Sequence, residues 1–174
     1  MTATQHPSAG PAPALYDSFA QYGSGVTLVS TRDGEEDLFF IAASVLTASV
    51  DPFTIAVSMG RTRAGAAAIA DGAPWAVSIL AADHLGLVRI LTGRTAREER
   101  RAALAAAGAQ RTQEGPMVLP DALVALACTT HAVTPVADQL LVVGEVRRGS
   151  AHREAPPLLR WNRGFVTGAP IPAE

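Results

Sequence analysis

FFIAASVLTASVDPFTIAVSMGRTR, residues 39–63, is the stretch that decides the fold. It predicts two β-strands joined by a tight turn at Asp51-Pro52, because apolar and β-branched residues lie on both sides of a turn dipeptide. Small residues in the first strand let a flat ligand approach the backbone. Arg61 and Arg63 follow the second strand directly and can meet an anion. The stretch therefore fits a planar ligand with an acidic group, or alternatively an ordinary pair of well-packed barrel strands.

Length and composition describe one domain. The chain of 174 residues is long enough to bury a sizeable core, and its formal net charge of -2 gives no basic surface for nucleic acid. No apolar run reaches membrane-spanning length, and no signal-peptide pattern opens the chain. The single cysteine, Cys128, cannot form an internal disulfide, which favours a cytoplasmic protein. Residues 1–13 predict a disordered tail, and residues 14–170 the folded domain.

Further segments show helix and strand patterns on both sides of the central stretch. The expected strands are residues 25–31, 75–80, 122–133 and 139–147, and the expected helices are residues 15–22, 63–70, 84–91 and 95–108. Asp33-Gly34 predicts a hairpin turn, and residues 135–138 predict another. Several strands at hairpin spacing with two helical insertions indicate a mainly β protein, an antiparallel barrel with a few peripheral helices.

Three helix starts carry capping signals. Thr62 is expected to cap the helix of residues 63–70, and the free N–H groups there favour a phosphate. Asp83 is expected to cap the helix of residues 84–91. Residues 95–98, Thr-Ala-Arg-Glu, match a capping box for the helix that follows.

The sequence lacks the motifs of several enzyme classes. It contains no G-x-G-x-x-G after a strand, no P-loop, no G-x-S-x-G and no metal-ligand cluster. His131 stands alone near a strand end, and Cys128 reads as a small buried apolar residue. We therefore expect no metal and no catalytic side chain.

The ordered set of segments resembles the short-chain flavin reductases of two-component monooxygenases, which have the FMN-binding split-barrel fold, a Greek-key antiparallel barrel. The resemblance covers about residues 16–165. It is carried by GVTLVSTRDG at 25–34, AASVLTASVDPF at 42–53, PWAVSIL at 74–80, ALVALACTTHAV at 122–133 and ADQLLVVGEV at 137–146, with PLLRWNRGF at 157–165 matching less closely.

This resemblance implies an NAD(P)H:flavin oxidoreductase that transfers a hydride from NADH or NADPH to FMN or FAD. It implies a homodimer that holds flavin near the subunit interface and releases reduced flavin to a partner oxygenase. The flavin carries the hydride chemistry, so the protein needs only to bind, orient and tune it. The cofactor-binding residues implied are Ala42, Ala43 and Ser44 at the ring edge, Thr47, Ser58, Met59 and Gly60 along the ribityl side, and Arg61 and Arg63 at the phosphate. Those implied for the nicotinamide donor are Asp138, Gln139, Trp161 and Phe165.

Some positions depart from the family's usual residues. Ile41, Ala43 and Leu46 stand where polar residues are usual, and Gln139 replaces a histidine that helps to hold the donor in several members. These departures support an alternative, a repurposed split barrel that binds flavin or a hydrophobic biosynthetic intermediate without NAD(P)H-dependent reduction. A dimeric scaffold without a ligand is a third hypothesis, but it leaves the small and hydroxylated central strand unexplained.

Overall fold

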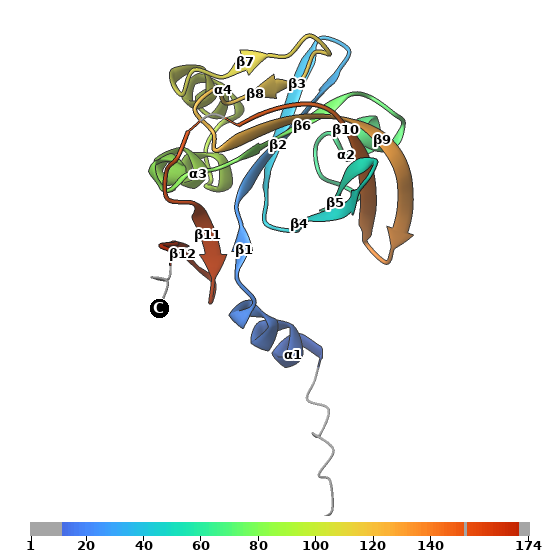
Figure 1. Cartoon of the computed structure of the whole chain (residues 1–174). Coiled ribbons are helices and arrows are strands. Elements are labelled where there is room, and N and C mark those ends of the chain that lie inside the picture. Colours follow the sequence, from blue (N-terminus) through green and yellow to red (C-terminus); the bar gives the residue numbers. More distant parts are fainter. Residues whose placement is uncertain (1–11, 152, 171–174) are drawn as a thin grey trace, which may run out of the picture.

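The computed structural model describes residues 12–151 and 153–170 (Figure 1). Most of the predicted tail, residues 1–11, lies outside this range. The described chain begins with helix α1, Ala12–Ser18, and a short 3-10 helix η1, Phe19–Gln21, where a helix was expected at residues 15–22. None of the helices in the described part of the chain is long and apolar enough to cross a membrane.

The main sheet closes on itself. Within the described residues it has seven antiparallel strands in the order β3-β2-β6-β9-β10-β5-β4. β3, Glu36–Ala42, and β4, Val45–Val50, lie at opposite ends of this order, although only two residues separate them in the chain. A two-residue link joins opposite edges only if the sheet curls into a barrel, so the predicted mainly β barrel is confirmed.

The central stretch was predicted as two strands, and the structure divides it into three. The turn at Asp51-Pro52 lies where it was expected, between β4 and β5, Phe53–Gly60. The first predicted strand, however, is broken at Ala43 and Ser44, where the chain passes from β3 to β4. Alternation of side chains does not mark this break, because it depends on which distant strand each half pairs with.

The remaining strands of the barrel lie near the predicted positions, two of them longer, one shorter and one shifted along the chain. They are β2, Thr27–Asp33, β6, Trp75–Ile79, β9, Val124–Val136, and β10, Gln139–Ala151. The predicted turn at residues 135–138 narrows to Ala137 and Asp138, because Pro135 pairs with Leu140 inside the ladder. Beyond Cys128, β9 pairs with β10 alone, and a proline without an N–H is tolerated where a strand has a partner on one side only.

Two small sheets flank the barrel. β1, Ser24–Gly25, pairs with β11, Leu158–Trp161, which pairs in turn with β12, Gly164–Thr167. β7, Gln110–Arg111, and β8, Met117–Val118, form a hairpin. Arg111 fastens this hairpin to β3 by two hydrogen bonds of 2.8 and 2.9 Å to Asp37. These bonds from the guanidinium hold the pKa of the Asp37 carboxyl below its usual value.

The helices exist near the predicted positions, but their predicted caps are wrong. α2 is shorter than expected, Ala66–Ala70, and its N-cap is Gly65 at φ 88°, not Thr62. At this left-handed φ glycine is favoured, and a Cβ there would also lie 2.8 Å from Thr31 Cγ2. The local pattern that indicated Thr62 contains no information about this contact with β2.

The other two predicted caps fail because their side chains bond elsewhere. Asp83 lies in a 3-10 turn, Ala82–His84, ahead of α3, Leu85–Thr92, and its carboxylate accepts two hydrogen bonds from Arg153. Thr95 precedes α4, Arg97–Ala106, but its hydroxyl donates to the Ile90 carbonyl at 2.6 Å. The first is a long-range contact and the second reaches back to the end of the preceding helix, and each competes with the local cap.

Two apolar clusters hold the fold. One fills the barrel around Trp75, and the other lies between the barrel and helices α3 and α4 around Leu104 and Leu119. Cys128 belongs to the barrel cluster, and burial raises the pKa of its thiol to about 12. It is therefore not a nucleophile at neutral pH, as the sequence predicted.

Gly144 on β10 leaves room for the buried Trp75 ring, because a Cβ at this position would lie 2.2 Å from Trp75 Cζ2. We expect Gly144→Ala to lower the free energy of unfolding by about 1–3 kcal/mol through overpacking. Urea unfolding measures this change. Gly86→Ala in α3 is the matched control, because nothing lies within 4 Å of the added Cβ, and equal stability of the two variants would contradict the prediction.

Candidate functional site

A pocket of about 790 Å³ lies between the barrel and the two ends of the described chain. Its volume falls in the range of small-molecule sites. The barrel wall consists of Ala43, Ser44, Val45, Leu46, Ala56, Ser58 and Leu141. The outer wall consists of Tyr16, Asp17, Phe19, Ala20, Tyr22, Gly23, Ser24, Gly25, Arg160 and Arg163.

The barrel wall follows from the closure of the sheet and from the alternation of side chains along β5. Ala56 and Ser58 line the pocket, whereas Val57 and Met59 belong to the core cluster inside the barrel. The backbone N–H of Ser58 donates to the Ser44 carbonyl at 3.1 Å, which fixes the β3–β4 link beside β5. The result is a wall in which two small side chains, Ala43 and Ala56, and two hydroxyls lie beside larger aliphatic side chains.

The outer wall is held by the tip of the β11–β12 hairpin. Trp161 Nε1 donates to the Gln21 carbonyl at 3.1 Å, and the Asn162 N–H donates to the Ala20 carbonyl at 2.7 Å. Gln21 Nε2 donates to Asn162 Oδ1 at 3.2 Å, so backbone and side chain both take part. We call these contacts, together with the ion pair between Arg163 and Asp17, the hairpin latch.

The hairpin latch depends on the tip of the β11–β12 hairpin, where two residues other than glycine have positive φ. Asn162 and Arg163 have φ of 46° and 63°, as in the two-residue hairpin turns whose twist matches that of the flanking strands. The tip therefore presents its backbone N–H and both side chains toward the N-terminal helical segment. Figure 1 shows this segment projecting from the body of the protein beside β1 and β11.

The structure brings three of the predicted cofactor residues together at the pocket, namely Ala43, Ser44 and Ser58. Ala42 is buried on β3, and its carbonyl accepts a hydrogen bond from Thr27 Oγ1. Thr47 is exposed on β4 and lies outside the pocket lining.

A second group of predicted residues lies at the end of the barrel where β5 and β10 meet. Gly60 pairs with Gln139, and the Arg61 N–H donates to the Asp138 carbonyl at 3.0 Å. The Arg63 guanidinium lies 5.5 Å from the centroid of the Phe40 ring. None of these residues lines the pocket, but Gly60 follows Ser58 by two strand positions, roughly 7 Å along β5. One strand therefore joins the two groups.

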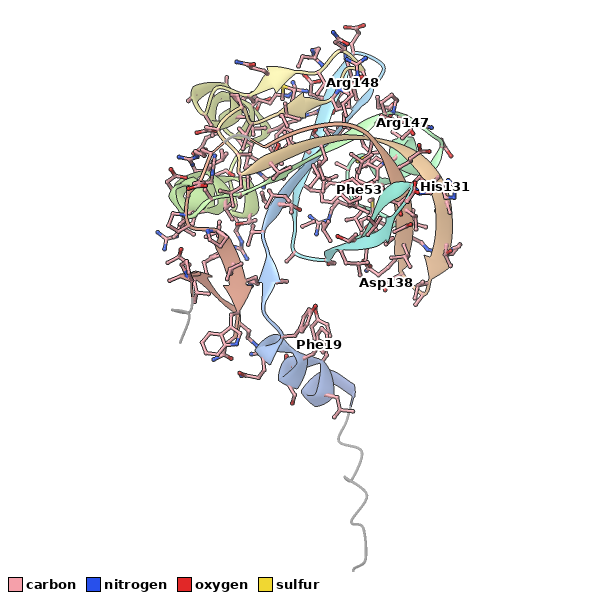
Figure 2. The ribbon with its side chains drawn as sticks, viewed as in Figure 1. Phe19, Phe53, His131, Asp138, Arg147 and Arg148 are labelled. Carbon is pink, nitrogen blue, oxygen red and sulfur yellow. The ribbon has the colours of Figure 1, made fainter. Side chains whose placement is uncertain are left out.

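The predicted donor residues of the C-terminal segment have structural contacts of their own. Trp161 is half exposed and holds Gln21, as described above. The Phe165 ring lies 5.0 Å below the Arg160 guanidinium and packs against the second apolar cluster. Figure 2 shows Asp138 at the far tip of the barrel, at the β9–β10 turn, and Phe19 at the N-terminal segment.

Phe19, Tyr22 and Arg160 of the outer wall were not predicted as site residues. Phe19 and Tyr22 lie in the segment that was expected as a helix, residues 15–22, and they are 66% and 68% exposed. The run of basic and aromatic residues at Arg160, Trp161 and Arg163 was the signal that could have indicated this wall. Among the described residues, no cluster of three or more potential metal ligands is present.

The family assignment rests on most of the chain. Residues 19–169 match the family model of the flavin reductase like domain. The chain belongs to this family, and the resemblance described from the sequence is confirmed.

Individual relatives agree with the family. The chain is 34% identical to an NADH:riboflavin 5'-phosphate oxidoreductase of Streptomyces pristinaespiralis, over 94% of this chain and 92% of the relative. It is 29% identical to the reductase component of 4-hydroxyphenylacetate 3-monooxygenase of Thermus thermophilus, over 87% and 93%. Its fold is similar to that of the Streptomyces globisporus NADH:FAD oxidoreductase SgcE6, solved with NAD and FAD fragments, with a TM-score of 0.79, 21% identity and coverage of 90% and 92%. The first two relatives support the reductase hypothesis and give no support to a barrel that has lost reduction, and the structural likeness shows the fold.

The hairpin latch yields a test of how the outer wall is held. We expect the double variant Trp161→Phe, Arg163→Met to raise hydrogen–deuterium exchange in residues 15–22 roughly tenfold, because it removes one hydrogen bond and one ion pair. Exchange in β5 stays unchanged. Arg89→Met on α3 is the control, and unchanged exchange in residues 15–22 of the double variant would show that the contacts do not hold the segment.

Proposed function

We propose that this protein is a flavin reductase that transfers a hydride from NADH or NADPH to FMN or FAD and supplies reduced flavin to a partner monooxygenase. The membership of the flavin reductase like family carries this proposal, together with the relative named as an NADH:riboflavin 5'-phosphate oxidoreductase. The reductase component from Thermus thermophilus supports the oxygenase partner. The fold, without a membrane-spanning helix among the described residues, and the buried thiol of Cys128 are compatible with the cytoplasm.

The barrel wall of the pocket fits a flavin ring. Ala43 has a small side chain at the β3–β4 link, so a planar ring can approach the backbone there, and Ser44 and Ser58 offer hydroxyls. When bound, the flavin supplies the hydride-accepting chemistry. The chain binds and orients it, and no side-chain acid or base is required.

The rest of the proposed binding surface runs along β5. Ala42, Thr47 and Met59 contribute contacts through their backbone or at the strand edge. Gly60 has no side chain, so its backbone is open to the ligand. The charges of Arg61 and Arg63, which follow it, suit the phosphate. We assign Asp138 and Gln139 to the nicotinamide donor because Gln139 pairs with Gly60 directly beside this surface. Trp161 and Phe165, on the β11–β12 hairpin, form the edge of the proposed site for the nicotinamide donor.

The direct test is the oxidation of NADH or NADPH, followed at the nicotinamide absorbance, with FMN or FAD as acceptor. We expect oxidation well above the rate without enzyme for at least one pair of donor and acceptor. Absence of oxidation with every pair, by a folded protein, would overturn the proposed function.

A variant that fills the barrel wall tests the flavin site. Ala43→Leu places a branched side chain at the pocket wall, so we expect FMN affinity to fall at least roughly tenfold in a fluorescence-quenching titration, because overpacking keeps the ring from the backbone. Ala102→Leu on the exposed side of α4, away from the pocket lining and from β4, is the matched control. Equal FMN affinity of the two variants would place the flavin elsewhere.

We also propose that the protein is a homodimer. β4 pairs with β5 on one side only, and it carries Leu46 and Val50 at 58% and 83% exposure. Phe53, which pairs with Val50 across the hairpin, is 40% exposed. An apolar edge strand of this kind is normally covered, and a second copy of the chain is the partner that the family resemblance implies.

Light scattering after size-exclusion chromatography tests the homodimer. We expect a mass of twice 18.0 kDa for the natural chain and a shift toward the monomer for Val50→Asp, because burying the new carboxylate is unfavourable. Ala105→Asp on the exposed side of α4 is the control. A monomeric natural chain would refute the homodimer.

A further inference from the structure

The outer wall of the pocket carries an aromatic pair that the protein itself does not cover. The rings of Phe19 and Tyr22 are stacked, with centroids 5.3 Å apart and planes at 28°. Both rings line the pocket, and both side chains are about two-thirds exposed. In Figure 2 the Phe19 side chain lies on the side of its segment nearer the barrel. Exposed aromatic rings beside a cavity are suited to stack a planar group.

The guanidinium of Arg160 lies on the same wall. Arg160 lines the pocket, and its guanidinium lies 5.0 Å from the Phe165 ring centroid. This cation–π contact orients the guanidinium but leaves its N–H donors available. In the described part of the chain, no carboxylate lies within ion-pair distance of Arg160, whereas the neighbouring Arg163 is paired with Asp17. The charge on this wall is therefore uncompensated at Arg160.

The two walls of the pocket suit different chemical groups. The barrel wall offers small and aliphatic side chains with two hydroxyls, and the outer wall offers stacked aromatic rings beside an unpaired guanidinium. A single flavin mononucleotide explains the barrel wall and, through Arg61 and Arg63, its own phosphate. It leaves the aromatic pair and Arg160 unused. An apolar ligand would cover the rings but would leave the guanidinium without an anion.

We propose that the outer wall binds the adenosine diphosphate half of a dinucleotide, with the adenine on the Phe19–Tyr22 pair and the diphosphate at Arg160. A guanidinium forms its strongest hydrogen bonds with phosphate and carboxylate groups, and adenine is a planar ring that stacks well on aromatic side chains. The inference rests on the proposed function in one respect, that the dinucleotide is NAD(P)H or FAD. The hairpin latch gives the wall its shape, because it fixes η1 against β11.

The first experiment measures binding without activity. Adenosine diphosphate ribose is titrated into the natural full-length chain by calorimetry, and we expect saturable binding. Arg160→Met keeps the apolar length of the side chain over Phe165 but removes the charge, and we expect affinity to fall roughly tenfold or more. Tyr22→Leu removes one ring of the pair and is expected to weaken binding at least fivefold, while Tyr22→Phe retains it.

Two comparisons then identify the dinucleotide: the KM for NADH against that for reduced nicotinamide mononucleotide, and the affinity for FAD against that for FMN. If the site holds the donor, Arg160→Met raises the KM for NADH roughly tenfold and leaves the KM for reduced nicotinamide mononucleotide, which lacks the adenosine half, unchanged. If the site holds the acceptor, the same variant lowers affinity for FAD and leaves affinity for FMN unchanged. Either result supports the proposal. The proposal is overturned if Arg160→Met changes neither the KM for NADH relative to reduced nicotinamide mononucleotide nor the affinity for FAD relative to FMN.

Controls separate this inference from the proposed function and from folding. Arg89→Met makes the same substitution on α3, away from the pocket lining, and should leave every constant unchanged. Absence of NADH and NADPH oxidation by the natural chain with either flavin would refute the reductase function, while binding of adenosine diphosphate ribose is judged separately by calorimetry. If Tyr22→Leu changes the mass in light scattering but not nucleotide affinity, the aromatic pair belongs to a contact between copies and the inference is wrong.

Discussion

The closure of the barrel at Ala43 and Ser44 is the constraint on which the site depends. Two residues connect strands at opposite ends of a seven-strand order, so the sheet must curl until β3 and β4 nearly meet. The hydrogen bond from the Ser58 N–H to the Ser44 carbonyl fixes this junction. Large side chains would obstruct such a tight junction, and the small ones that allow it also leave a shallow wall beside the backbone. The same geometry therefore closes the fold and forms the barrel wall of the pocket.

The second wall depends on contacts between the two ends of the chain. The hairpin tip at Asn162 and Arg163 reaches residues about 140 positions earlier and holds the helical segment that carries Phe19. The exposed rings and the guanidinium of Arg160 are then fixed opposite the small residues of the barrel. A site with one wall in the core of the sheet and one in a projecting segment can combine a rigid face with a more adaptable one.

Much of the fold could be predicted from local patterns, but the placement of the site residues could not. The turn at Asp51-Pro52 has a local cause, so it was found. Thr62 and Thr95 were predicted as caps because the sequence nearby matched, yet Gly65 fits against Thr31, and Thr95 bonds to Ile90. Arg61 and Arg63 were expected at the phosphate of the flavin whose ring lies at Ser44, and the structure places them after the end of β5, outside the pocket lining.

The sequence by itself determined the approximate positions of most strands and the family. Hydrophobic alternation, turn residues and the ordered segments are properties of neighbouring positions, so they can be recognised without the tertiary structure. Only the tertiary structure decided that the strand of residues 39–50 breaks in two, that Met59 points into the core while Ser58 points out, and that Phe19 and Arg160 share one pocket. Each of these depends on pairing between distant segments, and no local pattern specifies which distant segments will meet.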